Sequence, residues 1–276
     1  MRQDDGMPIL DKDMTLCISV ASRPSNLGTR FHNFLYDELS LPFVYKAFAP
    51  VDIGQTIAGI RGLGIRGCSV SMPFKEAVIP LVDEMTESAA AIDSVNTIVN
   101  TDGRLVAYNT DYTAVRKLVE ESGTSPSSAL VQGSGGMAKA VVAALHDCGV
   151  ARITVRSRNG ATGSQLAKRY SAEWVPESVQ VQADLLVNAT PIGMAGGDAE
   201  DDLPFARELI EAADSVLDVV AIPAETPLLR AARAASKRVM TGVEVTALQA
   251  ADQFELYTGV RPTADQVQRA AAFSRS

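Results

Sequence analysis

The sequence predicts an α/β protein made of two domains. Short apolar runs alternate with longer helical patterns from one end of the chain to the other, as in proteins whose sheets are largely parallel. A Gly-rich turn, GSGGMAKA (133–140), follows one apolar run and opens a helical pattern. The loop-like stretch GTSPSS (123–128) precedes it, and the character of the sequence changes there. With 276 residues, the chain has room for two domains of ordinary size.

Composition excludes several classes of protein. The chain is 46% hydrophobic and 21% charged, like an average soluble protein, and its net charge of −8 without a basic block argues against a nucleic-acid partner. No apolar run approaches the ~18 residues of a membrane span, and the polar start MRQDDGMPILDKD does not resemble a signal peptide. The three cysteines lack CxxC spacing, and no Cys/His cluster is present, so we expect a cytoplasmic protein without a metal site.

The predicted elements follow from the apolar pattern. Strands are expected at 15–20, 43–48 and 68–71, with helices at 31–39 and 53–63 between them, and a helix at 113–122. Residues 95–109 read VNTIVN-TDG-RLVAYN, where Asp-Gly between two alternating segments predicts a β-hairpin. Beyond the loop we expect strand, turn, helix and strand over 129–158, and strands at 184–188 and 215–220. The end of the chain predicts two helices interrupted at 259–262.

The Gly-rich turn predicts a dinucleotide site. A pyrophosphate needs a tight turn, a backbone that it can approach closely, and a helix N-terminus that points at it. Gly133 and Gly135 supply the first two features, and Ala138 takes the third glycine position of the motif, which requires only a small residue. Glycine also marks ordinary turns, but here a strand precedes the motif, and a helix and a second strand follow it.

The end of the second strand indicates which dinucleotide binds. An NAD site usually has Asp or Glu there for the ribose hydroxyl, whereas this chain has Ser157, Arg158 and Asn159. Arginine and small polar groups suit the 2′-phosphate of NADP, so NADP is the predicted cofactor and NAD the alternative. The other interpretation of this stretch is a solvated basic turn.

Six segments carry a resemblance to a known family: SVSMPFKE (69–76), SVNT (94–97), YNTDY (108–112), GSGGMAKA (133–140), VNATPIGM (187–194) and LQAADQFELYTG (248–259). Together they resemble the shikimate dehydrogenase family, and within it the shikimate dehydrogenase-like branch. The resemblance covers almost the whole chain in the family's order. It implies a substrate domain, 1–112 completed by helices in 246–276, and a Rossmann-type, doubly wound NADP-binding domain, 113–245, with a cleft between them.

The resemblance also assigns roles to residues. Lys75 matches the family's catalytic lysine and Asp111 its aspartate partner; Ser71, Asn96 and Gln249 match residues that hold ring hydroxyl groups. The expected cofactor residues are Gly133, Ser134, Gly135, Gly136, Met137, Ala138, Ser157, Arg158, Asn188, Thr190, Val219 and Gly242.

Lys75 and Asp111 are the candidate acid–base pair. Oxidation of a ring hydroxyl to a ketone sends a hydride to the nicotinamide and requires a group that takes the hydroxyl proton. These motifs contain no histidine, so the role falls to Lys75 with Asp111. We assign it to the pair because interacting groups share their protonation equilibrium. A structural salt bridge is the alternative interpretation.

The sequence departs from the family pattern in its substrate loop. The family carries Ser-x-Ser-Pro before His-Asn, and its serines hold the substrate carboxylate; this chain has Asn26, Leu27, Gly28 and Thr29 before Arg30, Phe31, His32 and Asn33. Ser22 and Asn26 are therefore the candidate carboxylate donors. Ser69 and Ser71 stand where the family often has Asn and Thr, and Ala221 stands in place of a tyrosine near the nicotinamide. Lost hydroxyl or carboxylate contacts change substrate preference strongly.

Three functions remain open at this stage. The first is an NADP-dependent dehydrogenase that interconverts shikimate and 3-dehydroshikimate. The second keeps this chemistry with quinate or an amino-substituted cyclic analogue, as the altered loop indicates. The third is a non-catalytic NADP-binding regulator, against which the joint presence of Lys75, Asp111, Asn96 and Gln249 argues. The expected partner is a small cyclic hydroxy acid, and the expected state is a monomer or homodimer.

Overall fold

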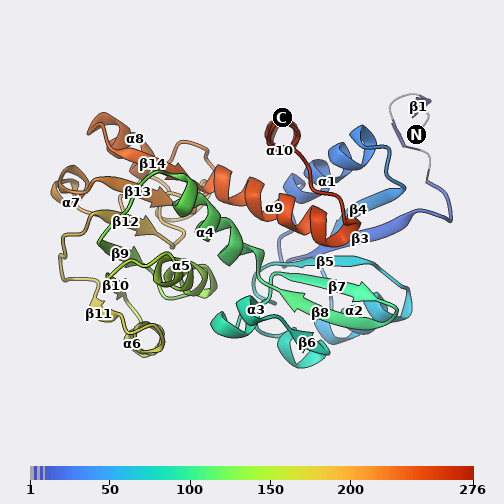
Figure 1. Ribbon diagram of the computed structural model, residues 1–276, viewed down its shortest axis with the longest axis horizontal. Helices are drawn as coiled ribbons and strands as arrows, with labels where there is room; N and C mark the ends of the chain where they lie inside the picture. The colour runs from blue at the N-terminus through green and yellow to red at the C-terminus, as the bar shows by residue number, and fades with distance from the viewer. Residues whose placement is uncertain (1–2, 5–6, 9) are drawn as a thin grey trace. The chain divides into compact units, whose positions relative to one another are not determined.

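The computed structural model describes residues 3–4, 7–8 and 10–276 (Figure 1). The chain divides into two compact units. Unit 1 comprises Met1–Thr110 and Ala247–Ser276, and unit 2 comprises Asp111–Thr246. The chain therefore passes between the units twice, and its last helices complete the unit in which it began.

Unit 1 contains a six-stranded sheet in the order β4-β3-β5-β7-β8-β6. The pairs β3–β4, β3–β5 and β6–β8 are parallel, whereas β5–β7 and β7–β8 are antiparallel, so the sheet is mixed. The predicted hairpin is β7–β8, and Asp102 and Gly103 form its turn with φ of 51° and 88°, as a tight hairpin turn requires. The strands are β3 (Thr15–Val20), β4 (Phe43–Phe48), β5 (Gly67–Val70), β6 (Glu84–Met85), β7 (Thr97–Thr101) and β8 (Arg104–Tyr108), and a separate pair is formed by β1 (Gln3–Asp4) and β2 (Met7–Pro8).

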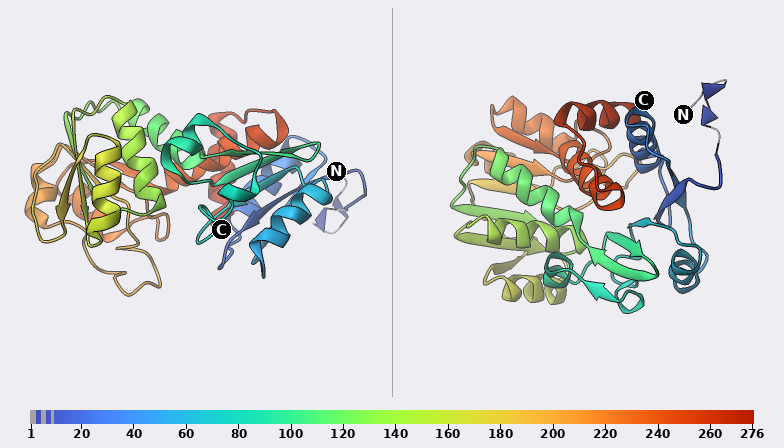
Figure 2. Two further views of the ribbon diagram at one scale, coloured as in Figure 1. Left: turned by 90° about the horizontal axis from the view of Figure 1, so that it is seen from below. Right: turned by 45° about the vertical axis from the view of Figure 1, so that its right-hand side comes forward.

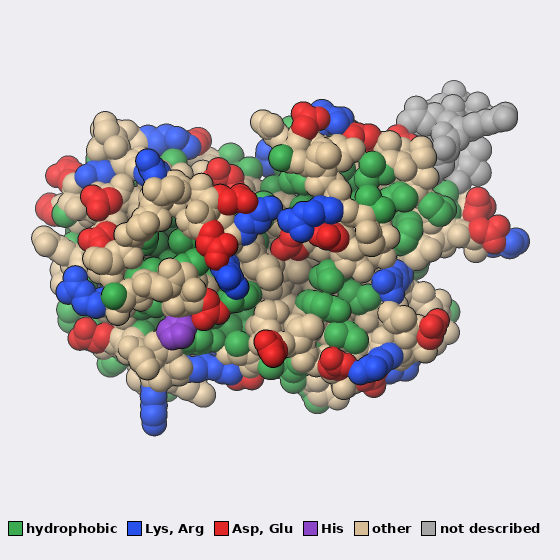
Figure 3. Space-filling view, in the orientation of Figure 1, with side chains coloured by type: hydrophobic (Ala, Val, Ile, Leu, Met, Phe, Trp, Pro, Cys, Tyr) green, Lys and Arg blue, Asp and Glu red, His purple; other side chains and the backbone are tan. Residues whose placement is uncertain are grey.

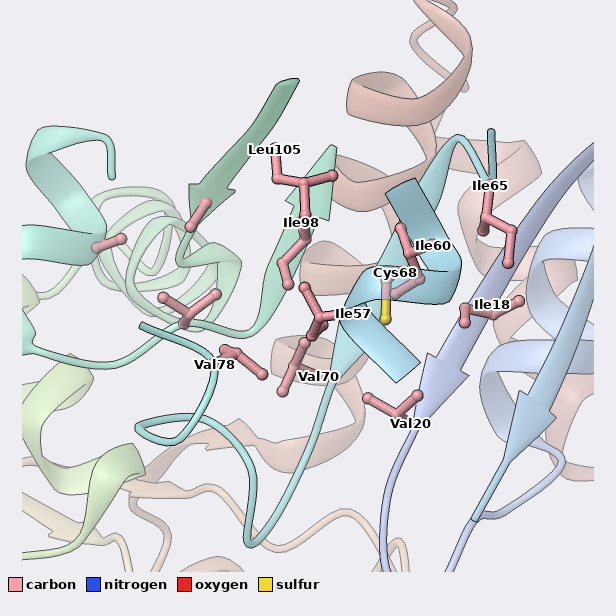
Figure 4. Close-up of a cluster of buried hydrophobic side chains, with 13 residues drawn as sticks. Ile18, Val20, Ile57, Ile60, Ile65, Cys68, Val70, Val78, Ile98 and Leu105 are labelled. Carbon is pink, nitrogen blue, oxygen red and sulfur yellow. The ribbon is translucent and has the colours of Figure 1, made fainter. Parts of the chain in front are cut away.

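Helices cover both faces of the unit 1 sheet. Alternate residues of β3 point to opposite faces: Ile18 and Val20 join the core beneath α2 (Figure 4), and Cys17 joins the core beneath α1, α9 and α10. Asp52 caps α2 by accepting from the backbone N–H of Gln55, and Thr263 forms a capping box that starts α10. The helices are α1 (Leu27–Glu38), α2 (Ile53–Gly62), η1 (Ile79–Leu81), α3 (Glu87–Ile92), α9 (Gly242–Thr258), which begins in unit 2, and α10 (Ala264–Arg275).

Unit 2 contains a six-stranded sheet in the order β11-β10-β9-β12-β13-β14, and every pairing in it is parallel. Helices α5 and α6 contact β9, β10 and β11, whereas α7 and α8 pack on Leu130, Leu186 and Val216 on the sheet's other face (Figure 2). This is the doubly wound arrangement that the sequence predicted. The elements are α4 (Thr110–Glu121), β9 (Ser128–Gln132), α5 (Gly136–Asp147), β10 (Arg152–Ser157), α6 (Gly160–Arg169), β11 (Glu173–Pro176), β12 (Leu185–Asn188), α7 (Arg207–Ala212), β13 (Ser215–Asp218), α8 (Pro227–Ala234) and β14 (Arg238–Thr241).

Most predicted elements occur within a few residues of their expected bounds. The strands at 15–20 and 43–48 have the expected limits, and the last two helices are interrupted where predicted, after Gly259 with φ of 75°. The apolar pattern does not predict the short elements α3, β6 and β11, nor α6–α8 and β14. Each of these elements spans only two to ten residues, so it offers few repeats of an apolar pattern.

Candidate functional site

The strand order of unit 2 creates a topological switch point at the carboxyl ends of its central strands, which we call the carboxyl edge of the sheet. The chain proceeds from β9 outward to β10 and β11, then returns to the other side of β9 with β12. In sheets of this kind, ligands bind at the carboxyl ends of the strands beside the switch point. The Gly-rich turn follows β9 and Asn188 ends β12, so the two segments lie next to each other at this edge.

The backbone of the Gly-rich turn fits the role predicted for it. Gly133 has φ of 121°, and a Cβ there would lie 2.9 Å from the carbonyl oxygen of Ala189. Gly135, which precedes α5, would direct a Cβ into open space, as a position approached by a pyrophosphate requires. No side chain caps the first turn of α5, and Ala138 is fully buried where the motif needs a small residue. These residues fit a dinucleotide phosphate.

The turn at the end of β10 lies beside the Gly-rich turn. The hydroxyls of Ser134 and Thr162 are 2.8 Å apart, which joins the first turn to α6. Asn159 caps α6 by accepting from the N–H groups of Ala161 and Thr162, and Arg158 is exposed. The exposed Arg158 is therefore available to a 2′-phosphate.

Arg156 and Ser157 point into the protein instead. The Arg156 guanidinium is buried, donates to Gln132 and to the carbonyl of Pro204, and stacks over Phe205. The Ser157 hydroxyl accepts from the indole N–H of Trp174 at 3.1 Å and donates to the carbonyl of Asn159. Ser157 thus shapes the turn, and Arg158 is the arginine that solvent reaches.

Asn188 organises the segment after β12. Its side-chain oxygen accepts from the backbone and the hydroxyl of Thr190, at 3.1 and 2.6 Å, and its amide donates to Asp218 at 3.0 Å. Asp218 also accepts from Thr226, and burial raises its pKa. Both predicted residues, Asn188 and Thr190, are thereby fixed at the sheet edge.

Val219 and Gly242 are also brought together in unit 2. A Cβ on Gly242 would clash with the carbonyl oxygens of Val219 and Val220, so glycine is required where the chain leaves β14. Val219 donates its backbone N–H to the carbonyl of Asn188 at 3.1 Å. The unit 2 residues predicted for the cofactor therefore gather at the carboxyl edge of one parallel sheet.

In unit 1, Lys75 lies just after β5. The backbone N–H of Ser71 donates to Val20, and Phe74 N–H donates back to Ser71, which turns the chain at the strand end. The carbonyl of Lys75 accepts from the N–H of Val95 at 3.0 Å, and Val70 N–H donates to the carbonyl of Asn96 at 2.7 Å. Lys75 is half-buried. These bonds hold the segments 69–76 and 94–97 side by side.

A buried polar network surrounds Asn96, which is fully buried. Its side-chain oxygen accepts from the hydroxyl of Thr97 and the backbone N–H of Thr110, both at 2.8 Å, and its amide donates to the Thr110 hydroxyl at 3.0 Å. Gln253 of α9 donates to Thr97 at 2.9 Å. The network joins β7, α4 and α9.

The remaining predicted residues lie after β3 (Ser22), before α1 (Asn26), after β5 (Ser71), on α9 (Gln249) and in the first turn of α4 (Asp111). Ser22, Asn26 and Ser71 are exposed, and the backbone N–H of Ser22 donates to the carbonyl of Met72 at 3.2 Å. Gln249 is half-buried on α9. Asp111 is only 4% exposed and lies in the first turn of α4, directly after Thr110 of the Asn96 network.

The predicted site residues do not include Thr97, Thr110, Gln253 or Asp218, which the structure places in these hydrogen-bond networks. Gln253 follows Gln249 by four residues on a helix, which is the one sequence signal that could have identified it. Within the described part of the chain, no group of three or more His, Cys, Asp or Glu residues could hold a metal ion. None of the helices that the structure describes is long and apolar enough to cross a membrane. On the face in Figure 3, acidic and basic side chains are interspersed.

The fold defines a class of protein: a two-unit α/β protein with a Rossmann-type parallel sheet in one unit and, in the other, a mixed sheet that carries Lys75 and the buried Asn96 network. The profile of the shikimate dehydrogenase substrate binding domain matches residues 25–98. A shikimate dehydrogenase-like protein of Haemophilus influenzae is 51% identical over 269 residues, 97% of this chain and 99% of its own length. A shikimate dehydrogenase (NADP(+)) of Oleidesulfovibrio alaskensis is 39% identical over 239 residues, 85% of this chain and 86% of its own.

A solved structure has the same fold. Quinate dehydrogenase from Corynebacterium glutamicum, in complex with NAD, superposes with a TM-score of 0.85 at 28% identity, covering 94% of this chain and 98% of the other. With the two relatives, this defines the family: the chain belongs to the shikimate dehydrogenase family.

Proposed function

We propose that this protein is an NADP-dependent dehydrogenase that interconverts shikimate and 3-dehydroshikimate. In this proposal residues 1–112 and 246–276 bind the substrate, and residues 113–245 bind NADP. The observation that carries it is the arrangement of the unit 2 sheet, where Arg158, Gly133 and Asn188 lie at the carboxyl ends of the neighbouring strands β10, β9 and β12, beside the switch point. The relatives supply the substrate class: one is named as an NADP(+)-dependent shikimate dehydrogenase.

The cofactor residues divide by the part of NADP that they meet. The open backbone at Gly135 and the uncapped first turn of α5 suit the pyrophosphate, together with Ser134, Gly136 and Met137. Arg158, exposed at the end of β10, suits the 2′-phosphate, while Asn188, Thr190, Val219 and Gly242 line the edge toward the nicotinamide. NADP⁺, when bound, supplies the hydride acceptor.

The substrate residues would hold the ring and move one proton. Ser71, Asn96 and Gln249 bind ring hydroxyl groups, and Ser22 or Asn26 binds the carboxylate. As the hydroxyl is oxidised, the Lys75–Asp111 pair takes its proton, and in reduction it returns a proton to the same oxygen. The hydrogen bond from the Val95 N–H to the Lys75 carbonyl holds the backbone of the lysine beside the Asn96 network.

Quinate is the second candidate substrate, with amino-substituted cyclic acids in the same group. The loop 26–29 lacks the serines that the family uses for the carboxylate, and a quinate dehydrogenase shares the fold over 94% of this chain. The third hypothesis is a regulator that binds NADP without turnover.

The deciding experiment is absorbance at the reduced-nicotinamide band, with purified protein, NADP⁺ or NAD⁺, and shikimate or quinate in each combination. The proposal expects reduction of NADP⁺ by shikimate, and faster reduction with NADP⁺ than with NAD⁺. Faster turnover of quinate would select the second substrate. NADP binding without turnover of either acid would reject both acids as substrates, and a preference for NAD⁺ would reject the role given to Arg158.

A further inference from the structure

Gln253 is buried among the strands that carry the substrate residues. It lies on α9 four residues after Gln249, and it is 4% exposed. Its amide nitrogen lies 2.9 Å from the Thr97 hydroxyl, 3.2 Å from the Ser69 hydroxyl and 3.4 Å from the carbonyl oxygen of Asn96. Because Ser69 and Thr97 are register partners in β5 and β7, one amide bridges both strands.

The direction of these hydrogen bonds is determined by the number of protons. The Thr97 hydroxyl has one proton, which it donates to the side-chain oxygen of Asn96 at 2.8 Å. Toward Gln253, the same hydroxyl must therefore accept. The Asn96 oxygen also accepts from the backbone N–H of Thr110, so the amide of Asn96 is oriented from two sides.

We propose that Gln253 is a positioning residue for the substrate site. Through Thr97 it sets the orientation of the Asn96 amide, and through Ser69 it holds β5 two residues before Ser71. It does not itself touch the reacting atoms. The inference rests on the proposed function, because Asn96 and Ser71 bind substrate only under that proposal.

The variant Gln253→Glu separates this role from simple filling of space. An ionised carboxylate only accepts hydrogen bonds, so the Thr97 hydroxyl would turn toward it and release Asn96. A protonated carboxyl donates a hydrogen bond, as the native amide does. It would restore the hydrogen bond to Thr97 and, through Thr97, the one to Asn96. The titratable group beside Gln253 is His32, whose ring is neutral because burial lowers its pKa. Since burial likewise favours the protonated form of a carboxyl group, the variant should regain activity as the pH is lowered. Gln253→Met, of similar length, offers no donor at any pH.

The kinetic comparison uses wild type, Gln253→Glu, Gln253→Met and Thr97→Val. We expect both Gln253 variants to lose about tenfold to a hundredfold in kcat/KM for the acid at pH 8, as for a lost buried hydrogen bond. Relative to wild type, only Gln253→Glu should recover at lower pH, and Thr97→Val should lose activity at all pH values. NADP affinity, followed through Trp174 in unit 2, should stay within about twofold. Equal, pH-independent kinetics of both Gln253 variants would overturn the proposal.

A second readout does not depend on turnover. In the free protein labelled with ¹⁵N, the side-chain amide of Asn96 should exchange slowly with water, and the exchange should quicken in Gln253→Met and in Thr97→Val. Unchanged exchange in both variants would overturn the positioning role, even where one of them is too unstable for kinetics. The two proposals can also fail separately. If the wild type turns over neither acid but the Asn96 amide exchanges faster in the variants, the proposed function is rejected and the positioning of Asn96 is supported.

Discussion

His32 is a fully buried imidazole stacked on Tyr45, with ring centroids 4.3 Å apart and planes 9° from parallel. Neither ring nitrogen forms a hydrogen bond of good geometry with a described residue, but the Gln253 side chain lies beside the ring and partly offsets the effect of burial. Burial lowers the pKa of His32 to about 3. The ring is therefore neutral in the folded protein and takes up a proton when the chain unfolds below the ordinary histidine pKa of about 6.5.

This uptake predicts a stability loss in mild acid. The contribution of His32 is fully present above about pH 6.5 and is lost as the pH falls toward 3, by up to about 1.4 kcal/mol per unit. The free energy of unfolding, measured with urea, should fall between pH 7.5 and pH 5.0. This fall should be about 2 kcal/mol smaller in His32→Phe than in wild type. His146→Gln, at an exposed ring, is the control. Equal losses in wild type and His32→Phe would contradict the prediction.

Lys75 is the residue on which the proposed chemistry depends. In Lys75→Met one member of the proposed acid–base pair is absent but the backbone bond to Val95 is kept, so kcat should fall about a hundredfold to ten-thousandfold. Cofactor and substrate affinities should change little, because the lost interaction belongs to the transition state. Steady-state kinetics and cofactor titration test this. A raised KM with unchanged kcat would instead make Lys75 a binding residue.

At the scale of elements, the turn between β9 and α5 contains two glycines with different requirements. A Cβ at Gly133 would meet the Ala189 carbonyl oxygen at 2.9 Å, and φ of 121° is unfavourable for alanine. At Gly135 a Cβ would meet nothing in the protein. The fold requires the first glycine, and only the proposed ligand would require the second.

The two alanine variants should therefore separate folding from binding. Gly133→Ala should lower the free energy of unfolding by more than about 1 kcal/mol and weaken NADP binding. Gly135→Ala should keep wild-type stability and still weaken NADP binding, because its methyl group occupies the space of the pyrophosphate. Chemical denaturation and cofactor titration measure both effects. Wild-type NADP affinity in Gly135→Ala would place the pyrophosphate elsewhere.

At the scale of the whole molecule, each unit contains buried hydrophobic clusters of its own. Two buried clusters belong to unit 1, one beneath α2 and one beneath α1, α9 and α10, and a third lies under α7 and α8 in unit 2. The last two helices complete unit 1, as Phe254 and Ala270 join the cluster that contains Cys17. The only tryptophan, Trp174, lies in unit 2, and its indole N–H donates to the hydroxyl of Ser157 at the end of β10.

Trp174 should therefore report on unit 2, to which we assign NADP binding. At one hundred times its dissociation constant, NADP should stabilise unit 2 by about 2.7 kcal/mol. The unfolding midpoint followed by Trp174 fluorescence should rise accordingly, and NAD⁺ at the same concentration should shift it less. An unshifted transition in saturating NADP would contradict cofactor binding to unit 2.

The sequence alone determined the fold class, the β7–β8 hairpin and the family. These features rest on local signals: apolar periodicity, Asp-Gly at a hairpin turn, and motifs that keep their order along the chain. It also identified the Gly-rich turn, because a strand–glycine–helix sequence has few alternative structures.

Only the tertiary structure decided how polar residues are paired. Which arginine reaches solvent depends on Gln132, Pro204 and Phe205, which bind Arg156 and leave Arg158 exposed. The Asn96 network likewise joins Thr97, Thr110 and Gln253, the last more than 150 positions away in sequence. Hydrogen bonds of buried side chains depend on which strands and helices pack together, and packing over long sequence separations leaves no local pattern.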